Sequence, residues 1–129
     1  MTKKLYRLPM FPNLVHTQQV EDVLSTHPAI IHNQACQQKL AEVMKDLNDF
    51  GVDKEFHRNP SNIKSLKKGW WEIRVKHQGI FWRILFRKVS PEKDNAEYGL
   101  IFMYPKKDNQ IPKSVWKSAS RNAKGEGWL

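Results

Sequence analysis

The sequence contains a single cysteine, Cys36, among 129 residues. One thiol excludes an internal disulfide and any metal site built from several cysteines, so a reducing, cytoplasmic setting is expected. The chain also lacks apolar runs of the ~18 residues that span a membrane, and it lacks the pattern of a secretory leader, so no membrane partner is expected. With 40% hydrophobic and 11% aromatic residues, residues 1–129 are expected to fold as one domain.

Familiar catalytic signatures are missing as well. The sequence has no Gly-rich phosphate loop, no nucleophilic serine motif and no dinucleotide-binding fingerprint. Its five histidines are scattered, and no two of them have the helical spacing of metal ligands with carboxylates nearby. We therefore expect no metal and no other cofactor.

Positive charge is abundant, but only in one half of the chain. The net charge is +9, yet residues 1–61 hold 7 basic and 7 acidic side chains and so balance. Residues 62–129 hold 15 basic and 6 acidic side chains, which accounts for the whole excess. A one-sided positive field attracts polyanions, above all nucleic acid, although a merely solubilising surface is the alternative.

The first half is expected to be mainly helical. The segment Lys4–Leu8 predicts a short strand, which Pro9 and Pro12 end. A helix is predicted from about Gln18 to Ser25, with Thr17 as its cap and Pro28 forcing its end. A longer helix is predicted over 33–50, capped by Asn33 and Gly51, with an apolar stripe at Cys36, Leu40, Val43, Leu47 and Phe50.

The second half is expected to form a meander of strands. Alternation predicts strands at 71–76 and 81–88, joined by a turn at Gln78-Gly79, and a polar hairpin loop is predicted over 90–96. The more continuously apolar segment 98–104 predicts a central strand, and a last helix is predicted to begin near Pro112. The predicted fold class is α+β, with two N-terminal helices packed on a twisted antiparallel β-sheet and a C-terminal helix.

One face of this sheet carries the candidate chemistry. Alternation places Glu72, Arg74, Arg83 and Arg87 on the same side of adjacent strands, and Lys106-Lys107 follow the third strand. When the 2′-hydroxyl of RNA cleaves the adjacent phosphodiester, the reaction needs a base, cations around the phosphorane and a proton donor. Arginine is well suited to be the cation, because its planar guanidinium can bind two phosphate oxygens. Glu72 is a candidate base whose pKa the nearby cations would depress. The alternative is a solvated strand surface with cross-strand Glu72–Arg pairs.

The aromatic residues divide into two groups. Trp71, Trp82 and Trp116 lie on predicted inward faces and are expected in the core. Tyr104 and Trp128 flank basic residues and are better candidates for stacking on bases, although Trp128 could equally dock on the core as part of the terminus.

The segment 66–74, LKKGWWEIR, resembles a block of the phage-derived, HigB-type branch of the RelE toxin superfamily. The resemblance continues at Gly79 and 83–86 (RILF), and resumes at 104–107 (YPKK) and at Pro112, Ala119 and Arg121. The segments 20–24 and 40–51 are similar to the helical hairpin of the family. The likeness therefore covers about residues 18–124.

The resemblance implies the two-helix, antiparallel-sheet fold and a metal-independent mRNA endonuclease (mRNA interferase) that inhibits translation at the ribosomal A site. It also implies a cognate, HigA-like helix-turn-helix antitoxin as a partner. By position, the residues around the scissile phosphate are Arg74, Arg83 and Lys107, and Glu72 occupies a strand position that is often Glu in this branch. The remaining RNA-binding candidates are Lys67, Lys68, Lys76, Arg87, Tyr104, Lys106, Arg121, Lys124 and Trp128.

The chain departs from the family pattern in two places. Many relatives end in a Tyr or His thought to act on the RNA, whereas this chain ends with Trp128-Leu129. The last helix also has Val115 and Lys117 where acidic residues are common. The catalytic acid is therefore unassigned. Two alternatives stay open: a non-catalytic, phage-derived RNA- or protein-binding module on the same fold, and a gyrase-poisoning relative.

Overall fold

The computed structural model describes residues 6–7, 10–90, 96–107 and 109–129. Its strands are β1 (Tyr6–Arg7), β2 (Leu14–His16), β3 (Ile63–Ser65), β4 (Trp71–His77), β5 (Ile80–Lys88) and β6 (Tyr98–Lys106). Its α-helices are α1 (Gln18–Thr26), α2 (Pro28–Ile31), α3 (Gln34–Phe50) and α4 (Lys113–Gly125), and short 3-10 turns occupy Lys54–Phe56 and Pro60–Asn62. The strands form one sheet in the order β1-β2-β6-β5-β4-β3.

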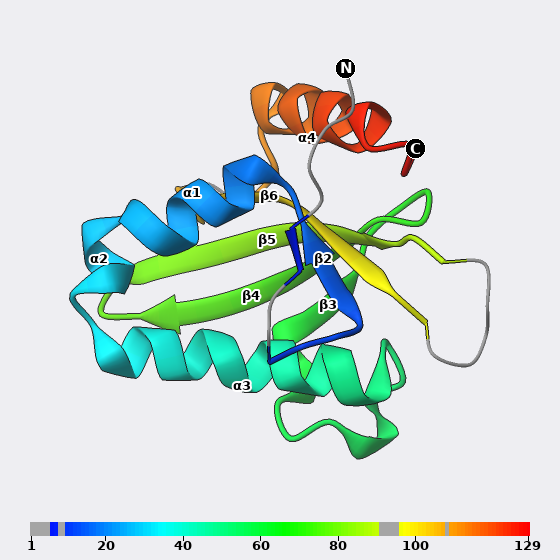
Figure 1. The fold of residues 1–129 in the computed structure, drawn as a ribbon. Helices are drawn as coiled ribbons and strands as arrows, with labels where there is room; N and C mark the ends of the chain where they lie inside the picture. The colour runs from blue at the N-terminus through cyan, green and yellow to red at the C-terminus, as the bar shows by residue number, and fades with distance from the viewer. Residues whose placement is uncertain (1–5, 8–9, 91–95, 108) are drawn as a thin grey trace.

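The architecture is α+β and has three layers (Figure 1). α3 covers one face of the sheet and α4 the other. α1 begins along β6, where Gln19 bonds both backbone groups of Met103, and side chains of α1 and α2 complete the core on the α3 face. The expectation of a purely antiparallel sheet is wrong, because β2 runs parallel to β6. This strand was not predicted, since three residues are too few to show a period.

The helices predicted over 18–25 and 33–50 are confirmed to within a residue at each end, and the last helix begins directly after Pro112, whereas α2 was not predicted. Thr17 caps α1, and the Asn33 Oδ1 atom accepts a hydrogen bond from the Cys36 N–H at the start of α3. At the end of α3, Gly51 has a φ of 59° and its N–H donates to the Leu47 carbonyl. Phe50 differs from the rest of the predicted stripe, since it is 40% exposed and lies against Phe56.

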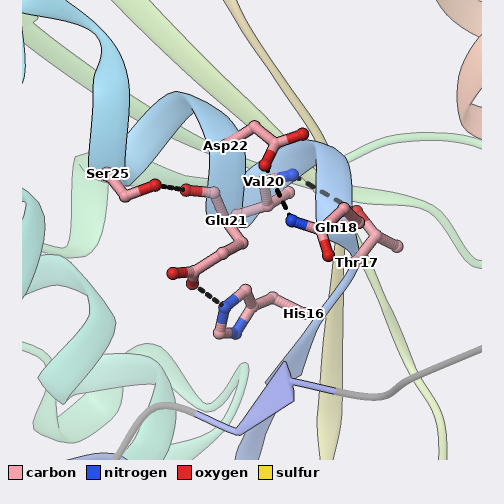
Figure 2. A network of polar contacts seen from close by, with 7 residues as sticks. All are labelled: His16, Thr17, Gln18, Val20, Glu21, Asp22 and Ser25. Carbon is pink, nitrogen blue, oxygen red and sulfur yellow. Dashed lines mark hydrogen bonds and ion pairs between the residues drawn. The ribbon is translucent and has the colours of Figure 1, made fainter.

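Side-chain hydrogen bonds fix the start of α1 to the sheet, and Figure 2 shows those among residues 16–25. The Thr17 Oγ1 atom accepts from the Val20 N–H at 3.4 Å and donates to the Ile101 carbonyl at 2.7 Å. The buried His16 ring places Nε2 2.7 Å from a carboxylate oxygen of Glu21. The first turn of α1 is therefore tied to β6, which is 84 residues away along the chain.

The three predicted C-terminal strands are confirmed as β4, β5 and β6, and the predicted turn joins β4 to β5. Gln78 and Gly79 both have positive φ, 49° and 80°, which suits the tight turn of a two-residue hairpin. Only Tyr6–Arg7 of the predicted first strand is described, and residues 91–95 of the predicted 90–96 loop lie outside the described residues.

Both faces of the sheet are apolar, and a register shift in β6 divides its residues between them. Opposite Leu85 and Phe86 of β5, the pairing passes from Phe102 to Leu100 and leaves Ile101 without an opposite residue. Leu100 therefore faces α3, whereas Ile101 faces α4. The larger core lies on the α3 face, and a smaller core under α4 contains Trp70, Leu85, Ile101, Ala119 and Ala123.

No helix in the described part of the chain is long and apolar enough to cross a membrane. Among the predicted core tryptophans, Trp82 is 1% exposed and Trp71 packs against the larger core. Trp116 packs partly buried against the smaller core, edge-on to Trp70 at 5.5 Å between ring centroids.

Candidate nucleic-acid interface

Three rows of side chains cross β4, β5 and β6 on the face that carries α4. Strand register sets each row: Lys76, Phe81, Lys106; then Arg74, Arg83, Tyr104; then Glu72, Leu85, Phe102. Leu85 lies in the smaller core under α4. We use the name sheet-end surface for the first two rows together with Glu72 and Lys107.

Glu72 holds two arginines of this surface at once. Its Oε1 atom accepts a hydrogen bond from Arg74 Nε at 2.5 Å, and its Oε2 atom lies 3.4 Å from Arg83 Nη1. The Glu72 side chain is fully buried and that of Arg83 is 4% exposed, whereas that of Arg74 is 45% exposed. Two guanidinium groups on one carboxylate leave net positive charge, and Arg74 is the group that presents it to solvent.

The burial of Glu72 and Arg83 differs from the open polar face that the alternation predicts. Alternation assigns a side chain to a face correctly, but it does not reveal what covers that face. Here α4 and the neighbouring aromatic rings of β6 cover part of it. Of the alternative interpretation, the cross-strand pair of Glu72 with Arg83 is present, whereas Arg74 pairs with Glu72 from the same strand and the carboxylate is buried rather than solvated.

Tyr104 lies opposite Arg83 in the β5–β6 register. Burial raises the pKa of its phenol above the ordinary 10.0, and the Arg83 guanidinium opposes this rise in part. The phenol therefore stays protonated at neutral pH. It can donate a hydrogen bond beside the two arginines, but it cannot act there as an anionic base.

Phe81 separates two lysines in the outermost row. The Lys76 ammonium lies 5.0 Å from the centre of its ring, and the Lys106 ammonium lies 5.9 Å from it. The Phe81 side chain is 45% exposed. Lys107, also exposed, follows directly after β6. An exposed ring between cations is a surface on which a base can stack while phosphates bind beside it.

The remaining predicted cations lie elsewhere. Lys67 and Lys68 line a hollow of about 320 Å³ with Trp70, Trp116 and Ser120. Arg121 and Lys124 line an adjoining hollow of about 550 Å³ along α4. We use the name α4 groove for both hollows together. The predicted RNA-binding residues thus divide between two surfaces rather than forming one.

Arg87 and Trp128 anchor the C-terminus. Arg87 donates from Nε to the Trp128 carbonyl at 3.1 Å and from Nη1 to the Lys68 carbonyl at 2.8 Å, and it lies over the Trp70 ring at 5.2 Å. The Trp128 ring rests on Gly99. These contacts match the expectation that Trp128 docks on the core, and any contact of Arg87 and Trp128 with RNA stays a prediction.

Sequence reasoning missed three contributors. Phe81 was not predicted as a site residue, although it is two positions from Arg83 and therefore lies on the same face of its strand. Its position between Lys76 and Lys106 could not be predicted, because it depends on pairing across three strands. Lys113 and Lys117 were not assigned to a site, yet their spacing with Arg121 and Lys124 was a readable signal of one helix face.

Within the ranges that the structure describes, no group of three His, Cys, Asp or Glu side chains could hold a metal ion. Comparison of the chain with protein-family models, curated proteins and solved structures finds no match.

Proposed function

We propose that this chain is a toxin of the RelE/HigB type that cleaves mRNA on the ribosome at its sheet-end surface. The observation that carries the proposal is the pairing of Arg74 and Arg83 across β4 and β5, with Glu72 bound to both and Tyr104 beside them. The LKKGWWEIR segment at 66–74, which resembles the HigB-type branch, supplies two of these residues. The α+β arrangement is compatible with that family's fold.

The arginines would act on the scissile phosphate. The 2′-hydroxyl gives its proton to solvent water as its oxygen attacks the adjacent phosphorus and forms a pentacoordinate phosphorane. The phosphorane then expels the 5′ oxygen, which takes a proton from water, and a 2′,3′-cyclic phosphate remains. Arg74, the exposed guanidinium, binds the non-bridging oxygens, and Arg83 adds positive potential from beneath. Both cations are already oriented before RNA binds, because Glu72 fixes them.

Glu72 and Tyr104 take supporting parts in this proposal. A carboxylate that is fully buried and paired with two arginines is poorly placed to remove the 2′ proton, so Glu72 is assigned as a positioning residue. Tyr104 stays protonated, and its buried phenol lies beside Arg83, so it is assigned to position that guanidinium rather than to touch the RNA. Lys106 and Lys107 attract the strand toward the site.

The partners follow from the same proposal. Translating ribosomes and mRNA are the target, and a HigA-like helix-turn-helix antitoxin is the expected inhibitor. The reaction needs no metal or other cofactor, since the attacking group belongs to the RNA. The toxin would act in the cytoplasm, where translation occurs.

The decisive experiment is cleavage of a defined mRNA in a reconstituted translation system. The purified chain should cut the message within codons and leave 2′,3′-cyclic phosphate ends. Arg74→Ala should reduce cleavage at least ~100-fold, since a guanidinium that stabilises the phosphorane contributes ~3 kcal/mol or more. Lys54→Ala, which removes an exposed cation elsewhere, should cleave normally. Undiminished cleavage by Arg74→Ala/Lys107→Ala would contradict the assigned site.

A non-catalytic RNA-binding module is the second candidate, and the burial of Glu72 favours it, since this carboxylate is not free to act as a base. Intact mRNA together with salt-sensitive RNA binding would support that candidate. Intact mRNA with broken DNA after induction of the chain in cells would instead support the gyrase-poisoning alternative.

A further inference from the structure

One face of α4 carries a line of cations. Lys113, Lys117, Arg121 and Lys124 recur at intervals of four, four and three residues, and all four are exposed. The helix contains no Asp or Glu. Across the described ranges, none of the four cations takes part in an ion pair. This face therefore presents positive charge that nothing on the helix offsets.

The line of cations borders a shallow, open hollow. All four line the hollow of about 550 Å³, together with Trp116 and Ser120. The hollow of about 320 Å³ shares Trp116 and Ser120 and adds Lys67, Lys68 and Trp70. Trp116 thus lies where the two hollows meet, with lysines on both sides.

The opposite wall of the α4 groove is held in place before any ligand binds. Lys68 has a φ of 59°, a left-handed conformation that a residue with a side chain adopts at a cost. Arg87 Nη1 donates to the Lys68 carbonyl at 2.8 Å, and the Leu66 N–H donates to the Trp70 carbonyl at 2.8 Å. The loop therefore fixes Lys67 and Lys68 at the mouth of the groove.

We propose that the α4 groove binds single-stranded nucleic acid at a site separate from the sheet-end surface. The phosphates would bind the cations of α4 and of the 67–68 loop, and a base would stack on Trp116. A basic groove with an aromatic platform is the general form of a single-strand binding site. A flat anionic membrane offers no planar ring to pair with the tryptophan, whereas each nucleotide of a single strand offers a ring together with a phosphate.

This site goes beyond the proposed RNA cleavage and does not depend on it. From Lys113 to Lys124 the helix rises ~16 Å, which accommodates a short single strand. The groove contains no feature that would select a 2′-hydroxyl, so RNA and DNA single strands of one sequence should bind alike, and a duplex should bind less tightly. If the sheet-end surface does cut mRNA, this groove would hold an adjacent unpaired segment.

The test uses the full chain carrying Arg74→Ala, so that cleavage does not consume the probe. Binding of fluorescein-labelled single-stranded RNA, single-stranded DNA and duplex RNA is followed by anisotropy as NaCl is increased. Lys117→Gln/Arg121→Gln should weaken single-strand binding about tenfold near physiological salt, and should lower the salt slope by about 1.4, since each phosphate contact contributes ~0.7. The matched pair Lys54→Gln/Arg58→Gln, on the other side of the molecule, should change neither.

Two further variants separate binding from folding. Lys68→Gly removes a cation and at the same time relieves the left-handed strain, so it should weaken binding while the melting temperature stays equal or rises. A merely structural role for Lys68 would leave binding unchanged. Trp116→Phe should fold, and it should lose part of the tryptophan quenching that the single strand causes in the parent protein.

Three results would overturn the proposal. The first is equal single-strand affinity in Lys117→Gln/Arg121→Gln and its parent. The second is tighter binding of duplex than of single strand. The third is no nucleic-acid binding, with vesicles containing anionic phosphatidylglycerol bound through Lys117 and Arg121 instead. In each case the outcome of the mRNA cleavage assay on the wild-type chain is independent, because that assay reports on Arg74.

Discussion

Arg83 and Glu72 form an ion pair that the folded sheet almost completely buries, with 3.4 Å between Nη1 and Oε2. A buried charge that loses its partner is costly, because the remaining charge is removed from water without compensation. Arg74 shares the same carboxylate, so Glu72 stabilises a buried cation and orients an exposed one with a single side chain.

The first prediction concerns the stability that this pair provides. Glu72→Ala should lower the free energy of unfolding by about 3–5 kcal/mol, because Arg83 is left buried and unpaired. Arg83→Met in the same chain should restore much of the loss, since a methionine fits the space without a charge. Urea unfolding of both single variants and the double variant measures the coupling. If the losses in unfolding free energy of the two single variants add up to that of the double variant, Glu72 and Arg83 do not stabilise each other.

The second prediction concerns the exposed ring of Phe81. Phe81→Leu keeps an apolar side chain between Lys76 and Lys106 but removes the surface on which a base would stack. Affinity for single-stranded RNA at the sheet-end surface should fall by the ~1–3 kcal/mol that stacking on one aromatic provides. Phe56→Leu, at a ring that is 58% exposed away from the site, is the control. A nitrocellulose filter assay in the Lys117→Gln/Arg121→Gln background isolates this surface, and equal affinities would rule out stacking on Phe81.

The third prediction concerns the contact between Trp128, near the C-terminus, and Gly99. A Cβ atom at residue 99 would lie 2.7 Å from the Trp128 ring and 2.9 Å from Val89 Cγ1, closer than real contacts allow. Gly99→Ala should therefore displace Trp128 and cost about 1–3 kcal/mol of unfolding free energy. Limited proteolysis should also remove the terminus faster. In a Trp128→Ala chain the added methyl should cost less. An equal cost in both backgrounds would show that Trp128 does not rest on Gly99.

The fourth prediction concerns alkaline pH. Burial raises the pKa of Tyr98 above its ordinary 10.0, and a hydrogen bond with the Val52 backbone opposes this in part. Below pH ~10 the phenol is neutral in both states, so it adds no pH dependence. Above that value the unfolded chain ionises first, and the free energy of unfolding should fall as pH rises toward the folded-state pKa.

Tyr98→Phe removes this ionisable group and should flatten the alkaline decline, although it also removes the hydroxyl contact at neutral pH. Tyr104, whose pKa is raised for the same reason, should preserve part of the decline in that variant. Unfolding in urea at a series of pH values gives the slope. A slope that Tyr98→Phe leaves unchanged would mean that Tyr98 ionises equally in both states.

Local pattern predicted the elements of this fold well. The stripe from Cys36 to Leu47 is buried as expected, and strict alternation placed β4 and β5 correctly. The β2–β6 pairing was not predictable, because it joins segments 84 positions apart and leaves no period in either. The shared face of Arg74 and Arg83 was predictable. The burial of Arg83 was not, since alternation does not reveal which side chains surround a residue on its face of the sheet.

Leu85 was a sequence signal that this face of the sheet is partly covered. In a strand whose other residues on that face are Phe81, Arg83 and Arg87, a leucine indicates that the face is partly covered. The structure shows α4 packed over it. The four cations of α4 lie on the exposed side of this same helix.

The parallel pairing of β2 with β6 also determines how late in synthesis the complete sheet can form. Leu14 pairs with Tyr98 and His16 with Leu100, so the N-terminal segment has no place in the sheet until three quarters of the chain has been made. Closing so long a loop is slow compared with forming local helices. A growing chain on the ribosome would therefore lack both the sheet end and the helix beside it. Synthesis would be nearly complete before either surface formed.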